Sequence, residues 1–540
     1  MQISSQQART SEAKSSVLAT AQFVTWPVLV EAVVLSATVC FIVFFIQWQY
    51  GFNWSDEGLQ WYISQRTALG QVPLRDFFSY DPGRYYWSAF FFKLLHGNGL
   101  LEQIVANATF GAVGLAVIYF AVAKAQLDRW WRIALIVLLG VMIGFPRHKV
   151  YEQALSLISV AGLAFVLAKP ASARRWFAYG IAAGLAGFIG RNSGLYFGLA
   201  ALLLVIVLKL TGTAFRANTA VGSCTLGILT GYLPMLLMLC FVHGLAAAFY
   251  QSVLFTPHWQ LPLPIPFPWH VHLKGLNPID VMQVRAVSIL CLAVPLTYVV
   301  AIWKWTKQRS SAALQLACAA SLAGLPWLHH AFSRGDFIHI AQAILPFAIA
   351  VAGICSFFWH RAEHKSALPI LCVSSFLILA AWLPYEPAIQ HFRERSGVAE
   401  KISINGRYFY VSADQAEVMQ IVVNAFRHCG SVDGSFLQAP YYPGLYAYLQ
   451  TRSPFWELYF LYHRSDTFQI KEIDALQQSN VSLVLLNPEA AMDGRTALSI
   501  GQTNPILLQF ILTNYRHSDA KLPQDFQLYY DPQKCSNPSF

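Results

Sequence analysis

A pair of adjacent carboxylates, Asp56 and Glu57, stands in the first polar segment after the first long apolar stretch of the chain. Trp, Tyr, Pro and Arg residues surround the pair in the segment 47–99. A carboxylate in such surroundings can accept a proton from a hydroxyl group while the oxygen attacks a carbon atom. The pattern therefore indicates a candidate catalytic base in this segment.

Basic side chains follow the Asp56–Glu57 pair and recur in later segments. These segments are expected on the outer side of the membrane, where the positive-inside rule predicts few Lys and Arg residues. Arg offers a planar fork and Lys a compact charge to phosphate oxygens. As a set they suggest a phosphate-binding cavity, and the alternative is a scatter of solvated or headgroup-contacting side chains. The set comprises Arg66, Arg75, Arg84, Lys93, Arg147, Lys149, Arg191, Lys274 and Arg334.

The strongest candidates for phosphate contacts are Arg84, Tyr85, Tyr86 and Lys93, which follow a Pro-Gly turn. In a helix that begins near this turn, Tyr86 and Lys93 are seven residues apart and share a face. An interfacial belt of aromatic and snorkelling basic residues would look similar.

Two further groups of polar residues lie at expected membrane boundaries. Arg334, Asp336 and His339 fall within six residues on the same side of the membrane as Asp56, which suggests a functional role, although an Arg334–Asp336 ion pair at a helix start would explain two of them. Arg191, followed by Asn192 in a Gly-flanked segment, either contributes to the same cavity or belongs to a simple turn.

Composition identifies the elements that must position these residues. Apolar residues make up 56% of the chain and charged residues 12%, values typical of an integral membrane protein. Apolar stretches of about twenty residues recur up to about residue 384, and we count about eleven transmembrane helices. The predicted architecture has an N-terminal cytoplasmic segment 1–25, a transmembrane domain 26–384 with the external loop 47–99, and a soluble domain 385–540.

The soluble domain is expected to be a small α/β domain, because charged residues return and apolar runs shrink to strand length. Residues 481–487 and 526–530 predict strands, 412–429 predict an amphipathic helix, and 440–454 predict an irregular loop. Cys429 and Cys535 both fall in this domain, and an oxidising compartment would let them pair, but the sequence does not show that their Cα atoms are close enough. The short Lys- and Arg-rich loops are expected in the cytoplasm, which puts the soluble domain in the periplasm of a bacterial inner membrane.

Three segments carry a resemblance to a known family: residues 55–87 around Asp56, 147–153 with Glu152, and 333–346 with Arg334. In these segments and in its layout, the chain resembles the GT-C glycosyltransferases, and among them the family 39-like group. That group includes the protein O-mannosyltransferases and the bacterial aminoarabinose transferases of lipid A. The resemblance implies a GT-C fold and transfer of a sugar from a polyprenyl-phosphate donor.

The resemblance also implies roles for individual residues. Asp56 would be the base, with Glu57 as helper or alternative, and the anomeric carbon would be inverted. Glu152 would be the second acidic residue of the site, although a local ion pair with Arg147 or Lys149 is the alternative. Arg334, Asp336 and His339 would contact the phosphate or the sugar of the donor.

No cofactor is expected, since the outer carboxylates and histidines have no spacing that specifies a metal site, and a divalent ion is left open. The expected partners are the lipid-linked donor, a glycan, lipid or protein acceptor, and membrane lipids. No nucleic-acid-binding motif is present, and the net charge of +10 partly reflects the cytoplasmic loops.

Other classes of membrane protein remain as alternatives. A transporter or lipid flippase would also have a charged cavity, but it commonly has internal repeats, and the two halves of the chain are not similar to each other. A polymerase or ligase of surface glycans would place its basic residues in a large late loop. A receptor would bind through the soluble domain, and Asp56 would be replaceable in it.

Overall fold

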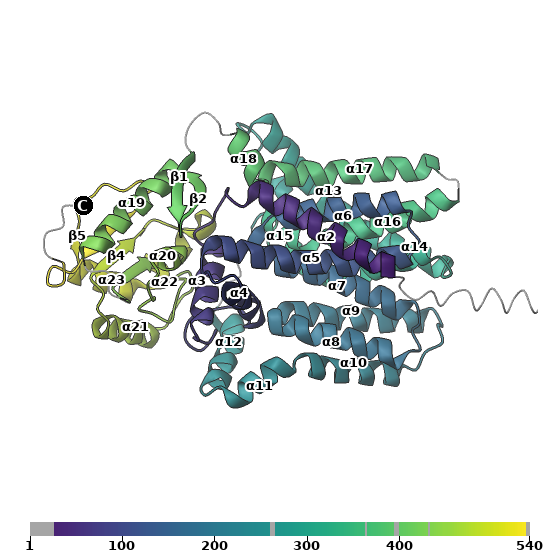
Figure 1. Ribbon diagram of the computed structural model, residues 1–540, viewed down its shortest axis with the longest axis horizontal. Helices are drawn as coiled ribbons and strands as arrows, with labels where there is room; N and C mark the ends of the chain where they lie inside the picture. Colours follow the sequence, from purple (N-terminus) through teal and green to yellow (C-terminus); the bar gives the residue numbers. More distant parts are fainter. Residues whose placement is uncertain (1–25, 260–264, 362–363, 394–398, 430–432, 536–540) are drawn as a thin grey trace, which may run out of the picture.

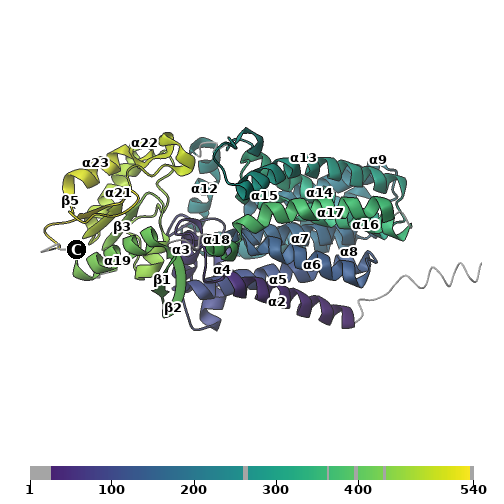
Figure 2. The same ribbon diagram turned by 90° about the horizontal axis from the view of Figure 1, so that it is seen from above.

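The computed structural model describes residues 26–259, 265–361, 364–393, 399–429 and 433–535. A bundle of long helices forms one part, and the elements after residue 398 form a second part beyond one end of the bundle (Figures 1 and 2). Two short helices of the first polar segment, α3 (Asp56–Ala68) and α4 (Gly83–Leu94), lie between the two parts. We call the second part the C-terminal domain.

The bundle contains most of the apolar sequence. Its other elements are α2 (Trp26–Gln47), α5 (Leu100–Lys124), α6 (Arg129–Gly144), η1 (Arg147–Lys149), α7 (Val150–Leu167), α8 (Ala173–Ile189), α9 (Arg191–Leu210), α10 (Ala217–Gly231), α11 (Leu233–Phe241), α12 (Leu245–Trp259), η2 (Pro268–His270), α13 (Pro278–Lys307), α14 (Ala312–Ser333), α15 (Phe337–Ala343), α16 (Leu345–His360), α17 (His364–Trp382), η3 (Leu383–Tyr385) and α18 (Pro387–Arg393).

Within the described residues, seven helices are long and apolar enough to cross a membrane, and two bent pairs raise the number to nine. The pairs are α10 with α11, bent by 50°, and α15 with α16, bent by 51°. The sequence predicts about eleven passes. Part of the difference lies in α6 and α8, which have 16 and 17 residues and run alongside the long helices in the bundle. The protein is a multi-pass membrane protein.

Small residues bring two of these helices into close contact. Gly180 and Gly184 of α8 face Gly227 and Gly231 of α10, and a Cβ atom added at any of the four would overlap the backbone of the other helix. Without a hydrophobic drive between helices in lipid, such backbone contact is a main source of helix association. It fixes α8, and so also the start of α9, where Arg191 lies.

The C-terminal domain is a small α/β domain, as its sequence predicts. Its elements are β1 (Ala399–Ile404), β2 (Arg407–Ser412), α19 (Ala413–His428), β3 (Phe436–Ala439), α20 (Gly444–Leu449), α21 (Asp466–Gln478), β4 (Leu483–Leu486), η4 (Met492–Gly494), η5 (Thr496–Leu498), α22 (Ile500–Thr503), α23 (Pro505–Asn514), β5 (Arg516–His517) and β6 (Gln527–Tyr530). The main sheet has the order β3-β4-β6-β5, with β3 and β4 parallel and the other neighbours antiparallel.

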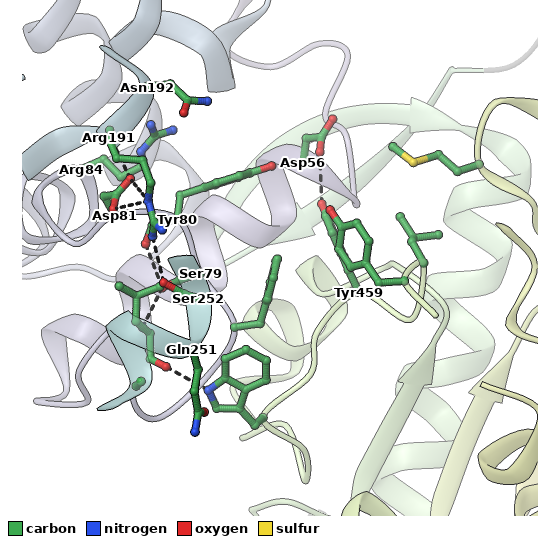
Figure 3. A pocket seen from close by; sticks show the side chains of 18 of the residues that line it. Asp56, Ser79, Tyr80, Asp81, Arg84, Arg191, Asn192, Gln251, Ser252 and Tyr459 are labelled. Carbon is green, nitrogen blue, oxygen red and sulfur yellow. Dashed lines mark hydrogen bonds and ion pairs between the residues drawn. The ribbon is translucent and has the colours of Figure 1, made fainter. Parts of the chain in front are cut away.

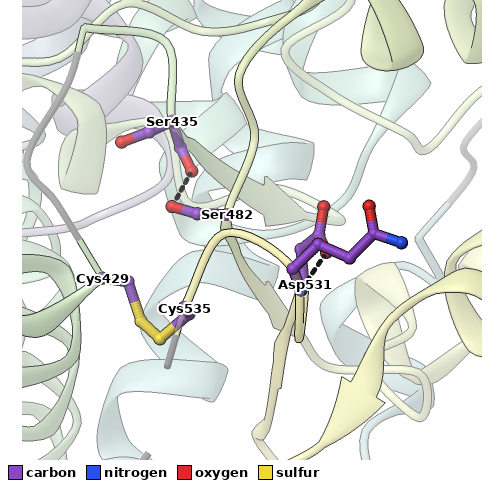
Figure 4. Close-up of a disulfide and its surroundings, with 6 residues drawn as sticks. Cys429, Ser435, Ser482, Asp531 and Cys535 are labelled. Atoms are coloured by element: carbon purple, nitrogen blue, oxygen red, sulfur yellow. Dashed lines mark hydrogen bonds between the residues drawn. A yellow bond between two sulfur atoms is a disulfide. The ribbon is translucent and has the colours of Figure 1, made fainter. Parts of the chain in front are cut away.

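Most local predictions for this domain are confirmed. The amphipathic segment forms α19, and the two predicted strands form β4 and β6. The segment 440–454 is not wholly irregular, since it contains the short helix α20. Cys429 and Cys535, whose pairing the sequence leaves open, form a disulfide with Cα atoms 4.7 Å apart, which joins the end of α19 to the end of the described chain (Figure 4).

A hairpin connects the C-terminal domain to the end of α2. β1 and β2 pair through a two-residue turn, Asn405-Gly406. Both residues have positive φ, as a type I′ hairpin turn requires. The backbone N–H of Tyr410 on β2 donates to the carbonyl of Gln49, at 2.8 Å. The Tyr410 ring stacks on Tyr50. The domain is therefore tied to the same segment that leads into α3.

Candidate active site

A large cavity lies between the helix bundle and the C-terminal domain (Figure 3). Its volume is about 1470 Å³, above the range of about 300–1,000 Å³ that is usual for sites of single small ligands. Residues of the first polar segment, of α7, α9, α12, α14 and α15, and of the C-terminal domain line it. The space is sufficient for the reacting ends of two substrates.

Asp56 lines this cavity at the first position of α3. The side-chain oxygen of Asn53 accepts from the backbone N–H of Asp56, at 2.9 Å, and so fixes the start of the helix. One carboxylate oxygen of Asp56 accepts a hydrogen bond from the hydroxyl of Tyr459, at 3.1 Å, and the other lies 3.5 Å from Nε2 of His148 (Figure 3). The side chain is 36% exposed, so a substrate in the cavity can reach it.

The surroundings of Asp56 favour its ionised form. Burial raises the pKa of this carboxyl, but His148, Lys149 and the Tyr459 hydroxyl more than offset that effect, and the pKa is lowered below its ordinary value. The positive end of the α3 dipole acts in the same direction. Asp56 is therefore a carboxylate at neutral pH and is able to accept a proton.

Glu57, the neighbour of Asp56, is committed to the structure of the bundle. Arg147 donates to both of its carboxylate oxygens, at 2.6 and 3.0 Å. The backbone N–H of Asn53 also donates to Glu57, at 3.0 Å. The two side chains of the ion pair are 8% and 1% exposed, and neither residue lines the cavity. This pair fixes α3 against η1, the short helix just before α7.

Glu152 and Arg84 both line the cavity and form an ion pair with each other, at 2.9 Å. Nε of Arg84 also donates to the carbonyl of Ile189, at 3.0 Å. The sequence leaves open a local ion pair of Glu152 with Arg147 or Lys149, but its partner is Arg84 from α4. Since the carboxylate of Glu152 neutralises this guanidinium, Arg84 is a weaker anion ligand than its position in the sequence suggests.

Arg191 lines the cavity and is held by a carboxylate in the same way. Its backbone N–H and its Nε donate to Asp81, at 2.7 and 3.0 Å, and its Nη2 donates to the hydroxyl of Ser252, at 3.1 Å. Its neighbour Asn192 also faces the cavity (Figure 3). The first polar segment, α9 and α12 thus meet at this guanidinium.

Arg334, Asp336 and His339 are brought together at the cavity wall. Asp336 caps α15 by accepting from the backbone N–H of His339, at 2.9 Å, and it also lies 2.8 Å from Nδ1 of that ring. Arg334 lies 3.8 Å from Asp336. Although burial acts in the opposite direction, His339 lowers the pKa of Asp336. The three residues therefore form the helix cap that the sequence offers as an alternative, and they also face the cavity.

Lys149 is a cavity residue that the analysis of individual sequence motifs missed. It appears in the sequence analysis as one of nine outer basic residues and as an alternative ion-pair partner of Glu152, without a role in the site. Within the described ranges it has no carboxylate ion-pair partner, in contrast to Arg84 and Arg191, which both have one. In the sequence, Lys149 directly follows Arg147 and His148 and stands three residues before Glu152, and this cluster of charged residues is the feature that could have indicated its role.

Tyr85, Tyr86 and Lys93 take different positions on α4. Tyr85 is buried beside a small pocket that adjoins Asp56, and its hydroxyl accepts from the backbone N–H of Tyr80, at 3.2 Å. Tyr86 is 37% exposed. Neither Tyr86 nor Lys93 is among the described residues that line the large cavity.

The C-terminal domain supplies aromatic side chains to the opposite wall, among them Trp456, Tyr459, Tyr462 and Phe468. Phe78 from the first polar segment packs against the first three of these rings. No motif in the sequence signals this contact. As for metals, no group of three or more His, Cys, Asp or Glu side chains in the described part of the chain is arranged to hold an ion.

Comparison with known proteins supports the fold. No protein-family model and no curated protein sequence matches the chain. The crystal structure of ArnT from Cupriavidus metallidurans bound to undecaprenyl phosphate is similar, with a TM-score of 0.53 and 13% identity over 94% of this chain and 98% of that chain. The oligosaccharyltransferase of Archaeoglobus fulgidus in the apo form aligns with a TM-score of 0.48 and 11% identity over 92% of this chain and 75% of that chain. On the first similarity, the chain has the GT-C fold that its sequence predicts.

Proposed function

We propose that this protein is a membrane glycosyltransferase that moves a sugar from a polyprenyl-phosphate donor to an acceptor hydroxyl. The observation that carries the proposal is an ionised, accessible carboxylate, Asp56, in a cavity that also holds several cations, in a chain with the GT-C fold. The similar ArnT structure was bound to undecaprenyl phosphate, which supports a lipid phosphate as the carrier.

In this proposal Asp56 is the base. The acceptor oxygen attacks the anomeric carbon of the donor sugar and forms the new C–O bond. The bond from that carbon to the phosphate oxygen breaks, and the electron pair leaves with the lipid phosphate. The acceptor proton goes to Asp56, whose lowered pKa keeps it ionised before the reaction. A single displacement of this kind inverts the anomeric carbon.

The lipid phosphate needs positive charge more than it needs a general acid, because phosphate is already a good leaving group. Lys149 fits this role, since its ammonium faces the cavity and forms no carboxylate pair within the described chain. Arg84 and Arg191 would assist from their ion pairs, and the His339 ring would assist as a hydrogen-bonding group. Lys149 and Asp56 both border the small pocket that adjoins the cavity. With the phosphate at Lys149 and the base at Asp56, the donor sugar would lie between these two side chains.

The orientation in the membrane follows from the same proposal. The short Lys- and Arg-rich loops stay in the cytoplasm of a bacterial inner membrane, and the cavity and the C-terminal domain face the periplasm. The Cys429–Cys535 disulfide supports this side, because disulfides persist in oxidising compartments.

The test is donor consumption in membranes that contain the protein and a crude envelope extract as the source of acceptor. A panel of undecaprenyl-phosphate sugars is supplied, and release of undecaprenyl phosphate is measured for the wild type, Asp56→Asn and Lys149→Met at matched expression. We expect release by the wild type, a loss of about 10²–10⁴-fold in Asp56→Asn, and a loss of about 10²–10³-fold in Lys149→Met.

The matched control is Lys274→Met, which removes an exposed lysine away from the cavity and should retain wild-type release. Equal release by Asp56→Asn and wild type would overturn Asp56 as the base. Movement of intact lipid-linked sugar across the membrane, without release of lipid phosphate, would replace the transferase by a transporter.

A further inference from the structure

Tyr459 is the one point at which the C-terminal domain donates a hydrogen bond to Asp56 within the described residues. We infer that Tyr459 is a positioning residue for this carboxylate, so that the reaction centre is complete only when the C-terminal domain is docked on the bundle. The inference rests on the proposed function, in which Asp56 is the base. It concerns a residue 403 positions away in the sequence.

Tyr459 is held in place by a buried charge of its own domain. Oε1 of Glu457 accepts from the backbone N–H groups of Leu458 and Tyr459, at 3.1 and 3.2 Å. The other oxygen, Oε2, forms an ion pair with Arg464. The Glu457 side chain is fully buried, so its orientation is strongly constrained. The Tyr459 ring itself is 5% exposed and packs against Phe78.

The C-terminal domain also contacts the chain on both sides of Asp56. Before it, the carbonyl of Trp54 accepts from the backbone N–H of Gly444, at 3.1 Å. After it, a Cβ atom added at Gly58 would lie 2.6 Å from Cα of Gly444, so the two backbones touch. Further along α3, the hydroxyl of Tyr62 accepts from the backbone N–H of Ser453, at 2.8 Å. The first turn of α3 and the C-terminal domain therefore form one rigid contact.

The Tyr459 hydroxyl acts on the carboxylate in two ways. Burial and the charge of Asp56 raise the pKa of Tyr459 well above its ordinary value, so the hydroxyl keeps its proton and donates it in a hydrogen bond. This bond occupies Oδ1 of Asp56, so that Oδ2, which lies 3.5 Å from Nε2 of His148, is the oxygen that takes the acceptor proton. It also stabilises the ionised form of Asp56. Other charged or titratable groups line the two pockets that Asp56 borders or act on its charge, namely His148, Lys149, Glu152, Arg84, Tyr80, Tyr85, His339 and Tyr462.

The test is the pH dependence of kcat/KM for release of undecaprenyl phosphate, with the donor identified in the panel above. Tyr459→Phe removes the hydroxyl and keeps the ring. We expect the acidic limb of the profile, which reports the base of the free enzyme, to move up by roughly one pH unit. The rate on the plateau should fall by about tenfold, because the carboxylate loses its fixed orientation.

Tyr62→Phe is the matched control, since it removes a hydroxyl of the same interface that does not touch Asp56. Its acidic limb should coincide with that of the wild type. If Tyr459→Phe does not fold, 3-fluorotyrosine at position 459 replaces it, and the stronger donor should move the limb down instead. An unmoved limb in both Tyr459 variants would overturn the inference, whereas equal release by Asp56→Asn and wild type would overturn Asp56 as the base in the proposed function.

Discussion

The two walls of the cavity differ in how they hold their functional residues, although a buried Arg–Glu ion pair lies next to the key residue of each wall. On the membrane side, Arg147 pairs with Glu57, the neighbour of Asp56, across 90 residues of sequence. On the side of the C-terminal domain, Arg464 pairs with Glu457, two residues before Tyr459 and seven residues away from Arg464. The first pair joins separate helices, and the second shapes a local segment.

The membrane wall shows that two adjacent carboxylates can have separate roles. Asp56 and Glu57 are consecutive, yet only Asp56 lines the cavity, because successive residues of a helix point in different directions. Glu57 is 6% exposed and satisfied by Arg147. The environment, rather than the residue type, assigns the reactive role to Asp56 and the structural role to Glu57.

The largest expected effect comes from breaking the pair of the membrane wall. Arg147→Met leaves the Glu57 carboxylate buried without a counter-ion, which typically costs about 3–5 kcal/mol of folding free energy. We expect a large fall in the fraction of folded protein during a denaturant titration in detergent, and loss of donor consumption with it.

The matched control is Arg393→Met, which makes the same substitution in a partly exposed pair with Asp280, where the side chains are 29% and 37% exposed. Such a pair contributes less than about 1 kcal/mol. If both variants unfold at the same denaturant concentration, the Arg147–Glu57 pair does not hold the wall together.

The sequence predicts the membrane wall better than the other wall. Hydropathy and the positive-inside rule locate the spans, and the Asp-Glu pair stands out because carboxylates are rare beside apolar stretches. The partners of those carboxylates are not predictable, since Arg147 and Arg84 reach them from distant segments. Tyr459 gave no signal at all, because an aromatic residue in a soluble domain usually belongs to the core.

The basic residues show the same limit. A helix face predicted from spacing groups Tyr86 with Lys93, but neither lines the cavity. Lys149 does line it, because the short η1 helix turns the chain at the cavity wall just before α7. Which cations keep a free charge depends on their tertiary partners, and these are absent from a linear pattern.

An effect of intermediate size is expected when Glu472, on the cavity wall, is replaced by Gln, and it concerns the stability of the C-terminal domain. Burial, together with the charge of Glu457, raises the pKa of Glu472 to about 8. Because the folded pKa exceeds the unfolded one, this group's contribution to stability is fully present below about pH 4.5 and is lost as the pH rises through about 8. Glu472→Gln should remove this loss and stabilise the domain on the order of 3 kcal/mol at pH 9.

The measurement is the unfolding free energy of the C-terminal domain, which limited proteolysis of the full-length protein reports at pH 4.5, 7 and 9. The difference between Glu472→Gln and wild type should grow with pH and vanish at the lowest value. The exposed Glu489 gives the control, since Glu489→Gln should follow the wild type at every pH. A constant difference across the range would mean that Glu472 does not change its protonation on unfolding.

The smallest expected effect concerns the membrane wall again. Ser252→Ala removes one hydrogen bond from Arg191, but Asp81 still accepts from Nε of its guanidinium and from its backbone N–H. One such bond is worth about 0.5–1.5 kcal/mol, so we expect KM for the lipid-linked donor to rise by roughly twofold to tenfold, with kcat unchanged.

The control for this prediction is Ser288→Ala, because within the described residues that hydroxyl bonds only to a carbonyl of its own helix and does not line the cavity. Its KM should equal that of the wild type. A hundredfold rise of KM in Ser252→Ala would show that Ser252 contacts the donor directly. An unchanged KM would instead show that Asp81 alone positions Arg191, and the membrane wall would then depend on its carboxylate pairs and not on the hydroxyl groups around them.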